Sequence, residues 1–218
     1  MALRSGAKYA TFPRGTAGHR PCRSRYDVGV SEFFQVLDFW FGAPASAERG
    51  RSRRCWFVKD AAFDAEVRVR FLGLYERAAA GDLDSWRRTP LCALALVVLL
   101  DQFPRNMFRG EARSFATDPR ALRVSRQIVE RRFDVLLRPV ERWFVYLPFE
   151  HAEDLAAQRR SLALFGTLPG DLAGTLDYAR RHYDIIARFG RFPHRNAILG
   201  RESTVEEAEF LRQPGSSF

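Results

Sequence analysis

The longest apolar stretch of the chain lies near its middle and constrains the fold more than any other segment. Ten apolar residues run without interruption over 91–100, between Pro90 and Asp101. Pro90 suits the first position of a helix, and Thr89 before it can act as the N-cap. A helix that is apolar on all sides must be buried on all sides, so we expect a central helix near 90–103 with the others packed around it. The stretch is too short to cross a membrane, which takes ~20 residues, and no membrane partner is predicted.

The rest of the chain shows helical periodicity. Over 61–80, apolar residues recur at steps of three and four, with Asp60 as the predicted N-cap and Gly81 as the end. No segment alternates at the period of two that a half-buried strand requires. Further helices are predicted at about 31–41, 118–133, 139–147, 150–165, 171–189 and 204–212. The sequence therefore predicts an all-α fold of about eight or nine helices packed as antiparallel neighbours.

Three details of these helices depend on single residues. Pro148 is predicted to stop the helix that begins at Pro139. Ser203 and Glu206 are predicted to form a capping box for the last helix. In the helix over 171–189, His182 lies outside the predicted apolar stripe and is expected to be half-exposed.

The first 27 residues differ in composition from the rest. The chain has 35 basic and 26 acidic residues, a net charge of +9, and residues 1–26 hold six of the basic groups and no acidic one. We predict a disordered basic extension over 1–27 and one helical domain over 28–218; an organellar transit peptide, which has a similar composition, is the alternative. Because most of the excess charge lies in this extension, nucleic acid is not a predicted partner. The oligomeric state is not predicted.

Several types of site have no signature in the sequence. The three cysteines Cys22, Cys55 and Cys92 lack the paired spacing of disulfides or zinc sites, which favours a cytoplasmic location. No HExxH or His-x-His pattern and no glycine-rich phosphate loop occurs. No metal and no cofactor are therefore predicted.

Polar side chains gather in three motifs where predicted helices begin or end. The motifs are LLDQFPRNMFRGEARSFATDP (99–119), YLPFEHAEDLAAQ (146–158) and RFGRFPHRNAILGRESTVEEAEFL (188–211). The predicted ligand-binding residues are Asp101, Gln102, Arg105, Asn106, Arg109, Glu153, Arg188, Arg191, Arg195 and Asn196. The candidates for proton transfer are His151, His194 and Glu150, because imidazole and carboxyl groups are the usual acids and bases of proteins.

Together with residues 36–42, these motifs resemble the uncharacterised bacterial family catalogued as domain of unknown function 924, over roughly 30–212. The resemblance implies an all-helical fold of the tetratricopeptide-like (TPR-like) superfamily and no established activity. Where relatives have two tryptophans near the second helix, this chain has Trp56 and Phe57.

Three interpretations of the motifs follow. In the first, they converge on an Arg- and His-lined cleft that binds a small anionic metabolite, a carboxylate or a phosphate, with catalysis as an option. That cleft would be deep and walled by Phe103, Phe108, Trp143 and Phe192. In the second, a TPR-like interaction module docks an acidic peptide or chain terminus. In the third, the polar residues only hold the helices together, with Asp101 and Arg105 as a helix-terminal ion pair and Glu150 and Glu153 in the first turn of a helix.

Overall fold

The computed structural model describes residues 25–216, which contain helices, turns and no strand. The helices are α1 (Arg25–Phe41), α2 (Ala61–Ala80), α3 (Pro90–Val97), α4 (Phe103–Met107), α5 (Asp118–Glu130), α6 (Pro139–Glu150), α7 (Leu155–Phe165), α8 (Gly174–Phe189) and α9 (Val205–Leu211). The all-α prediction is confirmed, whereas the TPR-like packing stays a prediction. Residues 1–24, which hold most of the predicted extension, lie outside the described residues. α1 begins at Arg25, earlier than the predicted start at Ser31.

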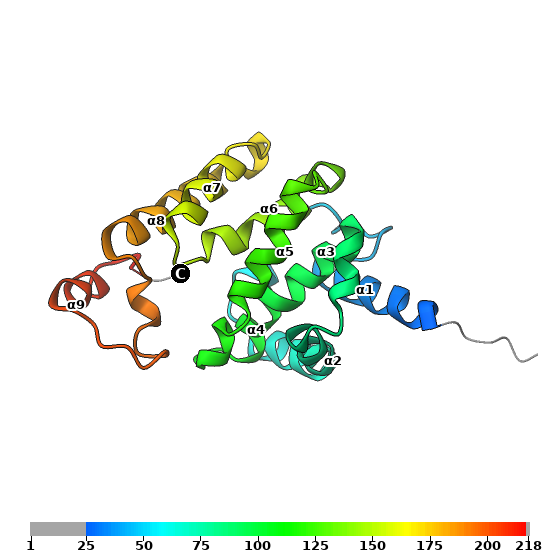
Figure 1. Cartoon of the computed structure of the whole chain (residues 1–218), viewed down its shortest axis with the longest axis horizontal. Helices are drawn as coiled ribbons and strands as arrows, with labels where there is room; N and C mark the ends of the chain where they lie inside the picture. Colours follow the sequence, from blue (N-terminus) through cyan, green and yellow to red (C-terminus); the bar gives the residue numbers. More distant parts are fainter. Residues whose placement is uncertain (1–24, 217–218) are drawn as a thin grey trace, which may run out of the picture.

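The apolar stretch forms the centre of the core, as predicted. Every residue over 93–100 is almost completely buried, and α3 contacts α1, α5 and α6. Figure 1 shows α3 inside the group formed by α1, α2, α5 and α6. Thr89 precedes α3 as expected, but its side chain makes no capping hydrogen bond.

The helical backbone continues past the predicted end of the central helix near residue 103. A π-helical turn, Val98–Gln102, carries the chain directly into α4. Pro104 lies in the first turn of α4 and has no N–H to donate to a preceding carbonyl. The Leu100 carbonyl instead accepts a hydrogen bond from Thr117 Oγ1 at 2.6 Å. Such π-turns re-aim side chains and are frequent at functional sites.

The predicted ends of α2 are correct. The Asp60 carboxylate accepts hydrogen bonds from the backbone of Ala62 and Phe63, and Gly81 ends the helix with φ +104°, a conformation that favours glycine. The predicted capping box before α9 is wrong by one residue. Thr204 and Glu207 form it, because Glu207 accepts from Thr204 N while Thr204 Oγ1 accepts from Glu207 N.

Pro148 does not stop α6, contrary to the prediction. It lies inside the last turn, and α6 continues to Glu150. A proline there removes only one hydrogen bond close to the natural end of the helix. α7 begins at Leu155 with Asp154 as its N-cap. Glu150 therefore ends α6 and Glu153 lies in the connector, so neither occupies the first turn of a helix.

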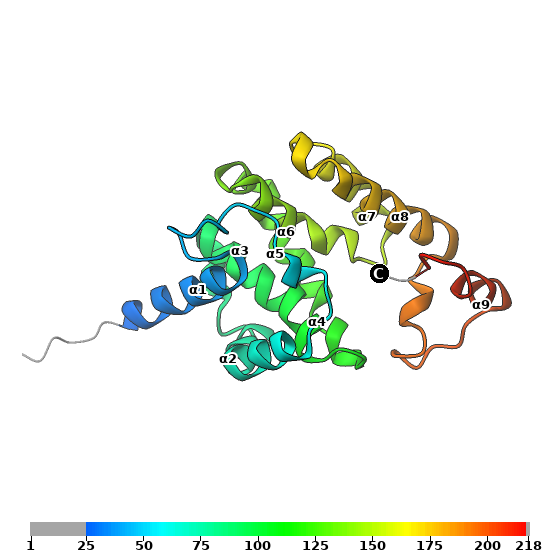
Figure 2. The same ribbon diagram turned by 180° about the vertical axis from the view of Figure 1, so that it is seen from behind.

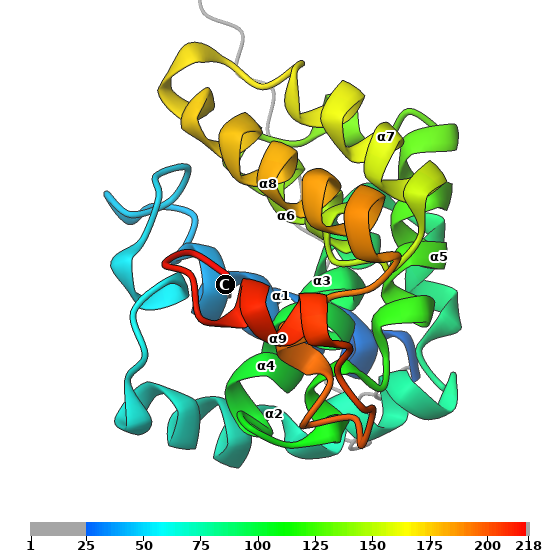
Figure 3. The same ribbon diagram turned by 90° about the vertical axis from the view of Figure 1, so that its left-hand side faces the viewer.

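The last third of the described chain forms a second layer. α7 and α8 are an antiparallel hairpin that packs along α6, and the segment from Gly190 to α9 folds at one end of this hairpin (Figures 1 and 2). A small apolar cluster of Ile185, Ile186 and Phe192 holds this end together. Figure 3, viewed from that end, shows α9 and the turn before it in front of α4 and α1. The third motif is thereby brought towards the other two.

Candidate functional site

The polar network begins at Asp101, whose carboxylate is fully buried. Gln102 Nε2 donates to Asp101 Oδ2 at 2.5 Å, and Arg105 Nη1 lies 3.4 Å from Oδ1. Burial opposes ionisation of Asp101, but the charge of Arg105 and the hydrogen bond from His151 outweigh it and lower its pKa to about 2. Asp101 is therefore a buried carboxylate anion near neutral pH.

His151 follows the last residue of α6 and faces Asp101. Its Nδ1 is 2.9 Å from Oδ1 and 3.0 Å from Oδ2. A carboxylate can only accept, so Nδ1 carries the proton and Nε2 keeps a lone pair. Burial, assisted by the charge of Arg105, lowers the pKa of His151 below its usual value even though Asp101 opposes this. Near neutral pH, His151 is a neutral imidazole oriented by a buried carboxylate, the arrangement used by general bases.

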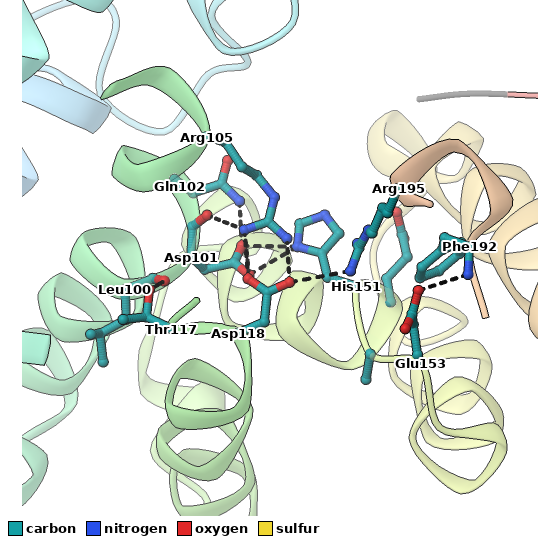
Figure 4. A network of polar contacts seen from close by, with 12 residues as sticks. Leu100, Asp101, Gln102, Arg105, Thr117, Asp118, His151, Glu153, Phe192 and Arg195 are labelled. Carbon is teal, nitrogen blue, oxygen red and sulfur yellow. Dashed lines mark hydrogen bonds and ion pairs between the residues drawn. The ribbon is translucent and has the colours of Figure 1, made fainter. Parts of the chain in front are cut away.

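Asp118 joins the first motif to the third. Arg105 donates to both of its carboxylate oxygens, at 2.9 Å each, and Arg195 Nη1 reaches Asp118 Oδ2 at 3.4 Å. Figure 4 shows Arg195 pointing towards Asp118 and His151 from the opposite side to Arg105. The helix predicted over 118–133 begins at Asp118. The structure places it in the first turn of α5, with its side chain on the two guanidinium groups.

Arg195 is the buried cation of the third motif, with only 6% of its surface exposed. Its guanidinium carbon lies 4.5 Å from the ring centres of both Phe115 and Phe192. The 3.4 Å contact with Asp118 is its ion pair, and its Nε has no hydrogen-bond partner among the described residues. Burial, with the like charge of Arg105, lowers the pKa of Arg195 to about 10, so it remains charged at neutral pH.

Glu150 and two histidines border the network. Glu150 is 4% exposed, and burial raises its pKa to about 8, with a further increase from the charge of Asp101. His182 Nδ1 lies 3.3 Å from Glu150 Oε1 and 2.9 Å from the Tyr178 carbonyl. His182 is thus buried and not half-exposed as predicted, and burial lowers its pKa to about 3. Burial and the charge of Arg195 lower the pKa of His194 to about 4.

The other predicted ligand-binding residues form ion pairs and hydrogen bonds between neighbouring segments of the chain. Asn106 and Arg109 donate to Asp64 of α2, at 2.7–2.9 Å. The Glu153 carboxylate accepts hydrogen bonds from Arg201 and from the backbone N–H of Phe192. Within the third motif, residues before α9 donate hydrogen bonds to glutamates of α9. Arg188 donates to Glu206, and Arg191 and Asn196 donate to Glu207.

The predicted aromatic walls are mostly elsewhere. Phe103 and Phe108 lie in the apolar core, and Trp143 stacks on Phe57 away from the network. Of the four, Phe192 borders the network, through Arg195. Two pockets of the described surface, of about 760 and 250 Å³, lie beside α1 and α2 and beside α5 and α7. The network is instead compact, with side-chain exposures of 21% for Arg105 and 14% for His151.

Sequence reasoning missed two residues of the network, Asp118 and Phe115. Both residues lie within the first motif (99–119), and this position was the one feature of the sequence that could have indicated them. Among the described residues, no group of three or more His, Cys, Asp and Glu side chains is placed to hold a metal ion. No helix in the described part of the chain is long and apolar enough to cross a membrane.

Comparisons with known proteins agree with the resemblance seen in the motifs. Residues 36–215 match the family model described as "Bacterial protein of unknown function (DUF924)". The chain is similar to the solved structure of ATU0120, a protein of unknown function from Agrobacterium tumefaciens. The two share 44% sequence identity over 84% of this chain and 97% of that one, with a TM-score of 0.74. Comparison with curated proteins gave no match.

Proposed function

The chain belongs to the DUF924 family of bacterial proteins of unknown function, and we propose that it binds a small anionic ligand at the Asp101 network. In this proposal Arg195 receives the anionic group and the His151–Asp101 pair accepts a proton from a bound molecule. The site lies where the π-turn, the start of α5, the end of α6 and the turn before α9 meet.

The observation that carries this proposal is the environment of Arg195. A buried guanidinium normally has its donors satisfied, because an unpaired buried polar group costs ~1–3 kcal/mol and a charged one more. Within residues 25–216, Arg195 is 6% exposed, has one long contact to Asp118 and has no partner for its Nε. An anion at Nε would satisfy this donor with a charge-assisted hydrogen bond.

The position of His151 supports a role beyond binding. Its Nδ1 is fixed by Asp101, and its pKa is lowered by burial, so the Nε2 lone pair is available near neutral pH. Water, or an O–H or N–H of a ligand held by Arg195, would transfer its proton to Nε2. The charge of Asp101 would stabilise the imidazolium that forms.

The alternative, docking of an acidic peptide, would use arginines spread along exposed helix faces. Three of the predicted arginines, Arg109, Arg188 and Arg191, lie in ion pairs with carboxylates of neighbouring helices. The buried, incompletely paired Arg195 favours the compact site. The proposed location is the cytoplasm, where the free thiols of Cys55 and Cys92 would stay reduced.

A thermal-shift screen of the full chain against carboxylated and phosphorylated compounds tests the proposal. A ligand at a hundred times its Kd stabilises the folded state by ~2.7 kcal/mol, which is roughly 5–10 °C for a domain of this size. Arg195→Ala should abolish the shift. Arg188→Ala is the matched control, because Arg188 forms an exposed pair with Glu206 and should leave the shift unchanged. A shift that persists in Arg195→Ala, or no shift with any compound, would contradict the proposal.

A further inference from the structure

We infer that the anionic group received by Arg195 is a carboxylate and not a phosphate or a sulfonate. This inference rests on the proposed function and specifies the ligand class of the same site. Three observations carry it: the donor edge that Arg195 offers, the charges already present in the network, and the rings against the guanidinium.

The donor edge has the geometry of a carboxylate. In arginine, Nε and Nη2 form one edge with two parallel N–H donors, which matches the two oxygens of a carboxylate in the same plane. Nη1 makes the contact with Asp118, whereas Nε has no partner among the described residues. Arg105 already binds a carboxylate in the same forked manner, because Nη1 and Nη2 both donate to Asp118.

The charges in the network favour a single negative charge on the ligand. Two guanidinium groups, of Arg105 and Arg195, face the carboxylates of Asp101 and Asp118. These four charges already cancel. A monoanion adds one negative charge to this balance, whereas a phosphate dianion adds two in a region where the fully buried Asp101 carboxylate cannot be screened by solvent.

The two rings restrict the directions from which Arg195 can be approached. Phe115 and Phe192 each lie 4.5 Å from the guanidinium carbon, and Phe192 is fully buried. Hydrocarbon against the guanidinium leaves its edge as the direction in which its N–H groups can donate. A planar carboxylate binds such an edge in the guanidinium plane, but a tetrahedral anion also directs an oxygen out of that plane, to the side of the rings.

Three probes that differ only in their anionic group test the inference on the full chain: benzoate, benzenesulfonate and phenylphosphonate. Their Kd values are measured by isothermal titration calorimetry. Benzoate should bind at least tenfold more tightly than either of the others. Arg195→Lys, which keeps the charge beside Asp118 but lacks the paired donors, should weaken benzoate binding at least tenfold. Arg188→Lys is the matched control and should bind benzoate like the wild type, and circular dichroism checks that both variants are folded.

The outcomes separate the inference from the proposed function. Phenylphosphonate or benzenesulfonate binding as tightly as benzoate, with loss in Arg195→Lys, would overturn the carboxylate inference and leave the anion site in place. Binding of all three probes that Arg195→Lys does not weaken, or binding of none, would overturn the anion site and the inference with it.

Discussion

Replacing the buried carboxylate of Asp101 with an amide should destabilise the fold more than the same change at Asp64, whose arginine partner reaches solvent. In Asp101→Asn, Arg105 and His151 lose the charge that they share, although the side chain keeps its volume. Removing one partner of a buried ion pair costs about 3–5 kcal/mol, and here Asp118 would be left as the one carboxylate facing both Arg105 and Arg195. For a domain of this size that lowers Tm by on the order of 10 °C. Urea unfolding should show a lower midpoint with an unchanged m value.

Asp64→Asn is the matched control for this measurement. Asp64 also accepts from an arginine and an amide, Arg109 and Asn106, but Arg109 is 39% exposed. Pairs that reach solvent contribute about 0–1 kcal/mol, so the control should lose much less stability. If Asp101→Asn costs no more than Asp64→Asn, Asp101 is not the buried centre of a charged network, and the reasoning about the site fails.

Three further predictions concern the groups around the network. Burial raises the pKa of Glu150 to about 8 from 4.5 in the unfolded chain, so the folded state holds one more proton than the unfolded state between these pH values. The free energy of unfolding should therefore decrease, by up to about 1.4 kcal/mol per pH unit, as the pH rises from 4.5 to 8. Urea midpoints measured from pH 5 to 8 should fall less steeply in Glu150→Gln, and parallel slopes would contradict this. Burial lowers the pKa of His182 to about 3 from 6.5, so below pH 6.5 the unfolded state binds one more proton and the free energy of unfolding should decrease as the pH is lowered. His182→Gln should make this decrease smaller between pH 6.5 and 4, and an unchanged decrease would refute the assignment. The Glu207 carboxylate accepts hydrogen bonds from Arg191 and from Thr204 N. Glu207→Ala should therefore speed amide hydrogen exchange in α9 roughly 10- to 100-fold and leave exchange in α3 unchanged. Equal changes in both helices would show that the effect is not local.

Elements with local signals were predictable from the sequence. α2 follows from its apolar period, its Asp60 cap and its Gly81 end, and the burial of α3 follows from its uninterrupted apolar residues. The end of α6 was not predictable in this way. Whether Pro148 breaks a helix depends on how far the helix continues beyond it, and here α6 ends two residues later.

The site was predictable as a set of motifs but not as a set of contacts. Asp101, Arg105, His151 and Arg195 were among the predicted residues, and the fold brings them into one network. Arg191, which was grouped with them, pairs with Glu207 instead. Sequence spacing cannot decide between these outcomes, because each arginine finds its carboxylate through tertiary packing.

His182 illustrates the same limit. The apolar period of α8 placed it beside the buried stripe, yet it is 5% exposed next to Glu150 and Phe192. When the buried face of a helix is predicted from its apolar residues alone, a histidine that is buried against a polar group of another helix is wrongly placed outside that face. Only the packing of α8 on the end of α6 reveals that Glu150 faces it.

The most direct test of the anion site is to observe the Nε–H group of Arg195 by ¹H–¹⁵N NMR while benzoate is added, with the signal assigned by comparison with Arg195→Lys. The Nε–H signal should shift in a saturable way, with a midpoint at the Kd that calorimetry gives for benzoate, and its exchange with water should slow as the donor gains a partner. An Arg195 signal that stays in place while benzoate raises Tm would show that the ligand binds elsewhere, and would contradict the proposed function.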